Sequence, residues 1–290
     1  MRPIITFLLV LLFSISAITP VNSARKRIGR TKSYVVMDAY TGRILFSKNI
    51  NKHVYPASLT KMMTILITFE HIEKGKLRWK DKVKISRNAS RKEPSKIHIR
   101  VGECITVKQA IMSLITKSAN NVAAALAEKI AGSERRFSNL MNRKAKELKM
   151  TASTFYNPSG LPHKWQKTTA HDMAKLTQAL ILRYGKYYNL FSTRSFRHRG
   201  NRYINHNKLL GKCIGLDGVK TGYTRAAGFN LAASARRGHN RIIAVVMGEN
   251  TSVARNKKVA ALVKKGFQKI GLFLRHKGPL KKRPSCIRKS

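Results

Sequence analysis

The sequence predicts an α+β fold in which both ends of the chain contribute strands to one sheet and the middle of the chain is helical. Short runs rich in β-branched and aromatic residues occur at 33–37 and 43–47, and again at 218–221, 229–235 and 241–247. The long segment between them carries helical periodicity and capping residues. Strands at both ends around a run of helices favour one sheet with a separate helical layer or subdomain.

The first two strands are expected to form a hairpin. The residues that join them, Asp38-Ala39-Tyr40-Thr41-Gly42, suit a tight turn because Asp and Gly favour turn conformations. A polar loop follows, and Pro56-Ala57-Ser58 then leads into an apolar, methionine-rich helix that extends to about His71. Gly75 marks the end of this helix.

Capping residues divide the centre of the chain into further helices. Thr106 and Gln109 fit a capping box, and Thr169 with Asp172 fits a second N-terminal cap. A break at Ser118-Ala119-Asn120 separates the first two of these helices. The predicted helices cover 106–116, 121–130, 133–150 and 169–184.

The last predicted helix covers 252–274 and is amphipathic. Its apolar side carries Val259, Leu262, Val263, Phe267, Ile270 and Phe273, and most of its lysines lie elsewhere. We expect the apolar side to dock on the sheet, with a helix lying on a membrane surface as the alternative.

The N-terminal segment resembles a secretory signal. A positive start, an apolar run from Ile4 to Phe13 and small residues at Ser23-Ala24 predict a signal peptide over 1–24, with an uncleaved membrane anchor as the alternative. The domain prediction is therefore a signal peptide over 1–24, one catalytic domain over 25–274, and a basic C-terminal tail over 275–290. The expected location is the periplasm or the cell envelope.

The composition is strongly basic. The chain has 59 Lys+Arg against 12 Asp+Glu, a formal net charge of +47. Such an excess attracts polyanions over long distances, whether nucleic acid, anionic membrane or acidic wall polymer. Export argues against nucleic acid, so peripheral contact with an anionic membrane or the wall is the expected consequence.

The cysteines and histidines predict neither a disulfide framework nor a metal site. Cys104, Cys213 and Cys286 make an odd number, and no CxxC or Cys/His metal spacing occurs. Cys104 lies in the apolar stretch 101–107 and is expected to be a small buried hydrophobic residue. We predict no metal and no cofactor.

Ser58-Leu59-Thr60-Lys61 is the first motif with chemical meaning. Residues three apart share a helix face, so the Ser58 hydroxyl and the Lys61 amine are expected within hydrogen-bond reach. A serine needs a base to become a nucleophile, and a lysine serves as one when burial or a nearby cation lowers its pKa. By itself the motif also fits an N-cap serine beside a surface lysine.

Two further motifs follow along the chain. Ser118-Ala119-Asn120 places a hydroxyl and an amide in a break between helices, where they could relay a proton and hold a substrate amide. Lys220-Thr221-Gly222 lies on a predicted strand. There Gly222 would admit a ligand backbone, while Thr221 and Lys220 would bind a carboxylate.

The order SxxK, SxN and KTG, on helix, loop and strand, resembles the motif set of penicillin-binding proteins and class A β-lactamases. Longer segments are similar to the low-molecular-mass D-alanyl-D-alanine carboxypeptidases of peptidase family S11. These segments lie at 37–42, 56–63, 157–162 and 217–224. The resemblance extends over roughly 33–273. It implies a five-stranded, mostly antiparallel sheet flanked by helices, with a helical subdomain beside it.

The resemblance also implies roles for individual residues. Ser58 would attack the terminal D-Ala–D-Ala bond of a peptidoglycan stem peptide, Lys61 would accept its proton, and Ser118 with Asn120 would line the opposite wall. The backbone N–H groups of Ser58 and Tyr223 would form the oxyanion hole. The substrate carboxylate would bind Lys220, Thr221 and, at the start of the last helix, Arg255. β-Lactam antibiotics would acylate Ser58.

Some residues depart from the pattern of that family. Ala119 replaces the more usual glycine, and Asn121 stands where an aspartate is common. No persuasive ExxxN loop occurs between SxN and KTG, which argues against a class A β-lactamase. The expected function is a serine D,D-carboxypeptidase. The alternatives are a D,D-endopeptidase that cleaves cross-links and a non-catalytic, basic wall-binding protein.

Overall fold

The computed structural model describes residues 31–276, with side chains described as far as Gly271. The predicted signal peptide, Cys286 and almost all of the predicted basic tail lie outside these residues. The last helix continues to His276, two residues beyond its predicted end. No helix within 31–276 combines the length and the hydropathy needed to cross a bilayer.

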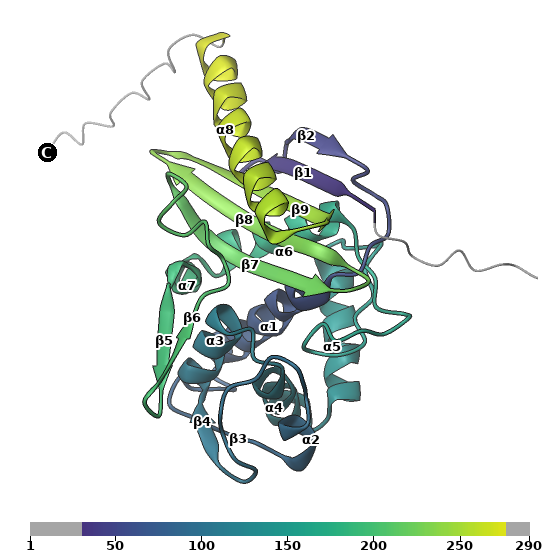
Figure 1. The fold of residues 1–290 in the computed structure, drawn as a ribbon, viewed down its shortest axis with the longest axis vertical. Coiled ribbons are helices and arrows are strands. Elements are labelled where there is room, and N and C mark those ends of the chain that lie inside the picture. The colour runs from purple at the N-terminus through teal and green to yellow at the C-terminus, as the bar shows by residue number, and fades with distance from the viewer. Residues whose placement is uncertain (1–30, 277–290) are drawn as a thin grey trace, which may run out of the picture.

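The central sheet has five antiparallel strands from the two ends of the described chain, as expected (Figure 1). Its order is β2-β1-β9-β8-β7, so the N-terminal hairpin pairs through β1 with the C-terminal strand β9. The strands are β1 (Ser33–Asp38), β2 (Ile44–Lys48), β7 (Leu216–Thr224), β8 (Gly228–Arg237) and β9 (Asn240–Glu249). This topology makes β7 an edge strand, and β7 carries the KTG motif.

Helices cover both faces of the sheet (Figure 1). One face packs on α8 (Ser252–His276), and the other packs on α6 (Ala170–Arg183) and the remaining helices. Alternate strand residues supply the two cores: Val245 points to the side of α6 and Val246 to the side of α8. The predicted docking of the last helix is confirmed, because Val259 and Val263 are fully buried against the sheet.

The helical subdomain contains the middle of the chain. Thr106 forms the predicted capping box, and Thr169 caps its helix as expected, its hydroxyl accepting a hydrogen bond from the Asp172 backbone. The elements of this part are η1 (Ala57–Thr60), α1 (Lys61–Glu73), α2 (Arg87–Ser90), α3 (Val107–Thr116), α4 (Asn120–Ala131), α5 (Glu134–Glu147), α7 (Gly185–Tyr188) and η2 (Asn189–Ser192).

Two small antiparallel pairs were not predicted. They are β3 (Lys82–Lys84) with β4 (Cys104–Thr106), and β5 (Ser195–His198) with β6 (Asn201–Ile204). The prediction that Cys104 is buried was wrong: Cys104 lies on β4 and is exposed. Successive strand residues face opposite sides, and here Ile105 points inward, so its neighbour Cys104 points to solvent.

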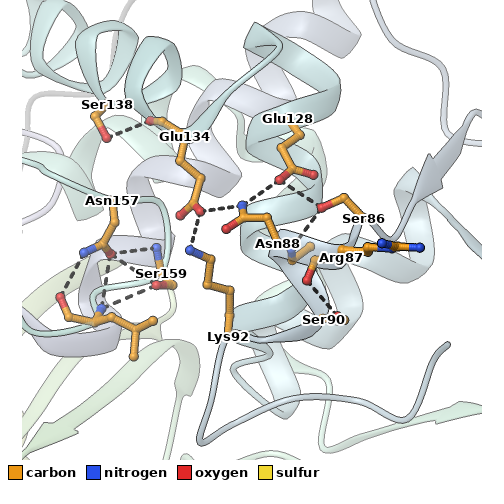
Figure 2. Close-up of polar contacts among 12 residues, drawn as sticks. Ser86, Arg87, Asn88, Ser90, Lys92, Glu128, Glu134, Ser138, Asn157 and Ser159 are labelled. Atoms are coloured by element: carbon orange, nitrogen blue, oxygen red, sulfur yellow. Dashed lines mark hydrogen bonds and ion pairs between the residues drawn. The ribbon is translucent and has the colours of Figure 1, made fainter. Parts of the chain in front are cut away.

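Polar contacts hold the helices of the subdomain together (Figure 2). The Glu128 carboxylate on α4 accepts hydrogen bonds from Ser86 at 3.0 Å and from Asn88 at 2.7 Å. Glu134 on α5 accepts one from Asn88 at 2.9 Å and pairs with Lys92 at 2.6 Å. These bonds tie α2 and the segment after it to α4 and α5. That segment leads directly to one wall of the candidate site.

Candidate active site

The structure brings the predicted site residues together around one cavity of about 280 Å³. Its walls come from η1, the α3–α4 connection, β7, β8 and the start of α8. The residues that line it are Ser58, Ser95, Ser118, His206, Thr221, Gly222, Tyr223, Phe229, Ser252 and Arg255. Lys61, Asn120 and Lys220 are buried beside these residues.

Ser58 lies in the η1 turn that precedes α1, and this turn is tightly enclosed by backbone. Ala57 has φ 48°, which is uncommon for a residue with a Cβ. At Gly160, where φ is +86°, an added Cβ would lie 1.9 Å from the Ala57 carbonyl oxygen. At Gly222 it would lie 3.1 Å from the Ser58 backbone nitrogen. Glycine at both positions therefore allows a loop and the edge strand to approach the turn that presents Ser58.

Asn230 on β8 anchors the same turn from the other side. Its amide nitrogen donates to the carbonyls of Tyr55 at 3.1 Å and Pro56 at 3.3 Å, and its oxygen accepts from the Gly248 backbone at 2.9 Å. Asn230 is fully buried. Sequence reasoning missed this residue, although a lone amide in an apolar strand was a usable signal, because buried polar groups need hydrogen-bond partners.

Lys61 begins α1, and its amine lies 3.1 Å from the Ser58 hydroxyl oxygen. The same nitrogen donates to the side-chain oxygen of Asn120 at 2.7 Å and to the carbonyl of Ser159 at 2.5 Å. When this amine is neutral, two N–H bonds directed at these two acceptors would leave its lone pair free to face Ser58. The geometry therefore suits proton transfer from the serine.

The charge state of Lys61 depends on its burial and its neighbours. Complete burial lowers its pKa well below the usual value, and the positive charge of Lys220 lowers it further. Burial, and then the charge of Arg255, lowers the pKa of Lys220 to about 7. A neutral Lys61 at neutral pH is the form that a general base requires.

The SxN segment forms the opposite wall. Ser118 is only 3% exposed, has φ 61°, and its hydroxyl has no hydrogen-bond partner among residues 31–276. A buried, unpaired hydroxyl in a strained backbone is typical of a functional site. Asn120 donates through its amide nitrogen to the Glu93 carbonyl at 2.9 Å, which orients its oxygen toward Lys61.

Asn121 holds this wall in place. Its amide accepts from the Ile97 backbone nitrogen at 3.3 Å and donates to the Ile97 carbonyl at 3.0 Å. A carboxylate could accept the first bond but could not donate the second, so an amide fits this position. The neighbouring Ser95 carbonyl accepts from the Asn120 backbone at 2.6 Å. The sequence marked Asn121 only as a departure from a family pattern.

Positive groups gather at the β7 and α8 end of the cavity. Lys220 and Arg255 are both buried, and burial lowers the pKa of Arg255 to about 10, which leaves it protonated at neutral pH. Ser252 opens α8 and contributes a helix N-terminus to the same wall. Together with the Thr221 hydroxyl, these groups suit a carboxylate. Tyr223 is 53% exposed and stacks on Phe229 with ring centroids 4.2 Å apart.

His206 is a further lining residue that sequence reasoning missed. Desolvation, followed by the charges of Lys220, Lys117, Lys208 and Lys61, lowers the pKa of His206 to about 4. Its imidazole is therefore neutral at neutral pH and offers a hydrogen bond rather than a charge. The surrounding sequence Asn-His-Asn carried no recognisable motif.

The assembled groups have the chemical abilities needed for acyl transfer. They comprise a serine hydroxyl beside a buried amine, a second hydroxyl across the cavity that has no partner among residues 31–276, and a cationic end that suits a carboxylate.

A family model described as D-alanyl-D-alanine carboxypeptidase, Peptidase S11, matches residues 21–251. The chain is 39% identical over 241 residues to the D-alanyl-D-alanine carboxypeptidase DacF of Bacillus subtilis strain 168. That match covers 81% of this chain and 62% of the relative, so the chain spans less than two thirds of the relative's length.

Solved structures show the same fold. Penicillin binding protein 5 from Haemophilus influenzae superposes with a TM-score of 0.79 at 34% identity, covering 83% of this chain and 71% of that one. Penicillin-Binding Protein D2 from Listeria monocytogenes, in its ampicillin bound form, gives 0.72 at 29% identity, covering 82% and 97%. With its SxxK, SxN and KTG residues around one cavity, the chain belongs to the D-alanyl-D-alanine carboxypeptidase family, Peptidase S11.

Proposed function

We propose that this protein is a serine D,D-carboxypeptidase that removes the terminal D-alanine from peptidoglycan stem peptides. Ser58 Oγ attacks the carbonyl carbon of the penultimate D-alanine, and the Ser58 proton passes to Lys61 Nζ. The backbone N–H groups of Ser58 and Tyr223 stabilise the resulting oxyanion. Lys220, Thr221 and Arg255 hold the substrate carboxylate.

The intermediate then collapses and the C–N bond breaks. The leaving D-alanine takes a proton from Ser118, which regains one from Lys61, and the acyl group stays on Ser58. Water then attacks this ester and gives a proton to Lys61, the acyl C–O bond to Ser58 breaks as Ser58 Oγ takes that proton back, and the shortened peptide leaves. A β-lactam would acylate Ser58 through the same first step.

The observation that carries this proposal is the environment of the Lys61 amine. Its nitrogen contacts the Asn120 side-chain oxygen, the Ser159 carbonyl and, at 3.1 Å, the Ser58 hydroxyl oxygen. Burial lowers the pKa of Lys61. An N-cap serine beside a solvated lysine would have neither property.

The direct test is D-alanine release from a muramyl pentapeptide by the full chain. Release of one D-alanine per stem, with cross-linked dimers left intact, is expected. Loss of dimers without loss of pentapeptides would identify a D,D-endopeptidase. Absence of both reactions from a folded sample that binds penicillin would contradict the proposal.

The pH dependence of kcat/KM is expected to be bell-shaped. Activity rises with pH as Lys61 loses its proton, and it falls above about 7 as Lys220 loses the charge that holds the carboxylate. The two limbs belong to the coupled pair of amines. In Lys220→Arg the guanidinium stays protonated, so the falling limb should move to higher pH. An unchanged falling limb in Lys220→Arg would contradict this assignment.

We further propose that the protein is exported and contacts an anionic membrane through α8. Nine of the twelve acidic residues form ion pairs, and Asp38, Asp81 and Glu128 accept other hydrogen bonds. Twelve acidic residues neutralise only a small part of the 59 Lys+Arg. The solvent side of α8 exposes Lys257, Lys258, Lys264 and Lys265.

Co-sedimentation with anionic vesicles tests this contact. We expect binding that weakens as salt rises, because exposed charges are screened. Changing the four exposed α8 lysines to glutamate should weaken it more than the same change at Arg135, Arg136, Arg143 and Lys146 on α5, which are also exposed. An equal loss of vesicle binding from the α8 and the α5 substitutions would show that binding depends only on net charge and not on α8.

A further inference from the structure

The segment 156–165 carries three aromatic side chains that do not line the cavity and that the proposed reaction does not use. Tyr156 is 52% exposed and Trp165 is 45% exposed. The Tyr156 ring stacks on the His163 imidazole with centroids 3.2 Å apart and planes 6° apart. The Lys164 amine lies 5.5 Å from the centre of the Trp165 ring. We call Tyr156, His163 and Trp165 the aromatic platform.

Buried polar groups hold the loop that carries the platform. The Gln166 side chain is 2% exposed, and its oxygen accepts from the backbone of Tyr156 at 3.1 Å and of Asn157 at 3.3 Å. Its nitrogen donates to the Leu161 carbonyl at 3.0 Å. Asn157 accepts from the backbone of Gly160 at 2.8 Å and lies beside Ser159 in Figure 2. The aromatic side chains are therefore presented by an ordered loop, which lowers the entropy cost of binding.

The same loop reaches the reacting groups. The Ser159 carbonyl accepts the 2.5 Å hydrogen bond from Lys61, and Gly160 packs on the backbone of Ala57. Tyr156 is three residues from Ser159, so their Cα atoms are at most about 11 Å apart. Tyr156 is therefore joined by a short segment to the part of the loop that contacts Lys61 and Ala57.

We propose that the aromatic platform is a subsite for a pyranose ring of the glycan strand to which the stem peptide is attached. This inference rests on the proposed function. In a stem peptide, three residues separate the acylating D-alanine from the lactyl group of the sugar, a span of about 10 Å when extended. Tyr156 is three residues from Ser159, whose carbonyl contacts Lys61, so a sugar at the end of such a peptide is within reach of this loop.

The chemistry of the platform suits a sugar. A pyranose has an apolar C–H face that packs on aromatic rings and a rim of hydroxyl and amide groups that bind polar side chains. Tyr156 and Trp165 offer the rings, and His163 and Lys164 offer polar partners. Residues 156–167 contain no acidic side chain that would repel an anionic peptide carried by the sugar.

Trp165 provides a spectroscopic test that needs no catalysis. The chain has two tryptophans, and the other, Trp79, packs on Phe69 with ring centroids 6.3 Å apart. A Trp79→Phe chain of full length therefore reports on Trp165 alone. We expect peptide-free glycan strands, prepared by amidase digestion, to change its fluorescence saturably. A change with anionic vesicles but not with glycan would overturn the proposal in favour of membrane contact.

Kinetics provide the second test. Trp165→Ala and Tyr156→Ala should each lower kcat/KM about fivefold for D-alanine release from a glycan-linked pentapeptide. For the same variants, kcat/KM for D-alanine release from the free pentapeptide should change by less than twofold. Trp165→Phe should retain most of the preference for the glycan-linked substrate. Ile214→Ala, which truncates a 78% exposed residue elsewhere, serves as the control.

The outcomes separate this inference from the proposed function. Equal losses on both substrates, or no loss on either, would overturn the subsite while leaving the carboxypeptidase assignment in place. Saturable glycan binding by a protein that releases no D-alanine would support the subsite and contradict the proposed function.

Discussion

Replacing Ser58 with alanine is expected to abolish acylation. Intact mass spectrometry after incubation with benzylpenicillin should show one adduct on the wild-type chain and none on Ser58→Ala. D-Alanine release should fall by at least about 10⁴-fold, because the covalent route needs this hydroxyl. The only hydrogen bond recorded for the Ser58 side chain within residues 31–276 comes from Lys61, so the variant should fold normally.

The control for this experiment is a serine outside the cavity. Ser192 sits on η2, is exposed, and donates only to the nearby Asn189 carbonyl. Ser192→Ala should keep the adduct and the activity. An adduct that persists on Ser58→Ala would place the nucleophile elsewhere and would contradict the proposed mechanism.

Replacing Lys61 with arginine is expected to have the second largest effect. A guanidinium stays protonated even when buried, so it cannot accept the Ser58 proton. We expect the rate of acylation by penicillin to fall by about 10³-fold, within the usual range for loss of a general base. Stopped-flow or timed mass spectrometry would measure it.

Two further variants separate loss of the base from a packing defect. Lys61→Met removes the amine but keeps a chain of similar length, and it should lose acylation to a similar extent. Lys257→Arg, on the exposed side of α8, is the matched control and should acylate at the wild-type rate. Acylation of Lys61→Met at near wild-type rate would show that another group takes the proton.

Much of the fold follows from local patterns. Short runs rich in β-branched and aromatic residues predicted the five strands of the central sheet, and capping residues such as Thr106 and Thr169 predicted helix starts. The short pairs β3–β4 and β5–β6 were missed because strands of three or four residues hardly differ from loops in sequence. Cys104 was misplaced for a related reason: the sidedness of a short strand depends on its pairing.

The sequence by itself determined which residues could supply the chemistry. Ser58 and Lys61 share one turn, so their contact follows from a spacing of three residues. The order of the SxxK, SxN and KTG motifs along the chain indicated the family. The spacing of Ser58 and Lys61 is local, and the order of the motifs is fixed along the chain. Both can therefore be read directly from the sequence.

Only the tertiary structure decided how that chemistry is tuned. The Lys61 pKa depends on burial and on Lys220, which is distant in sequence, and the Lys61 amine is held by Asn120 and Ser159. The hydrogen bonds from Asn230 to the segment before Ser58 likewise join residues that are distant in sequence. Desolvation and long-range hydrogen bonds exist only when distant segments pack, so no local pattern could have specified them.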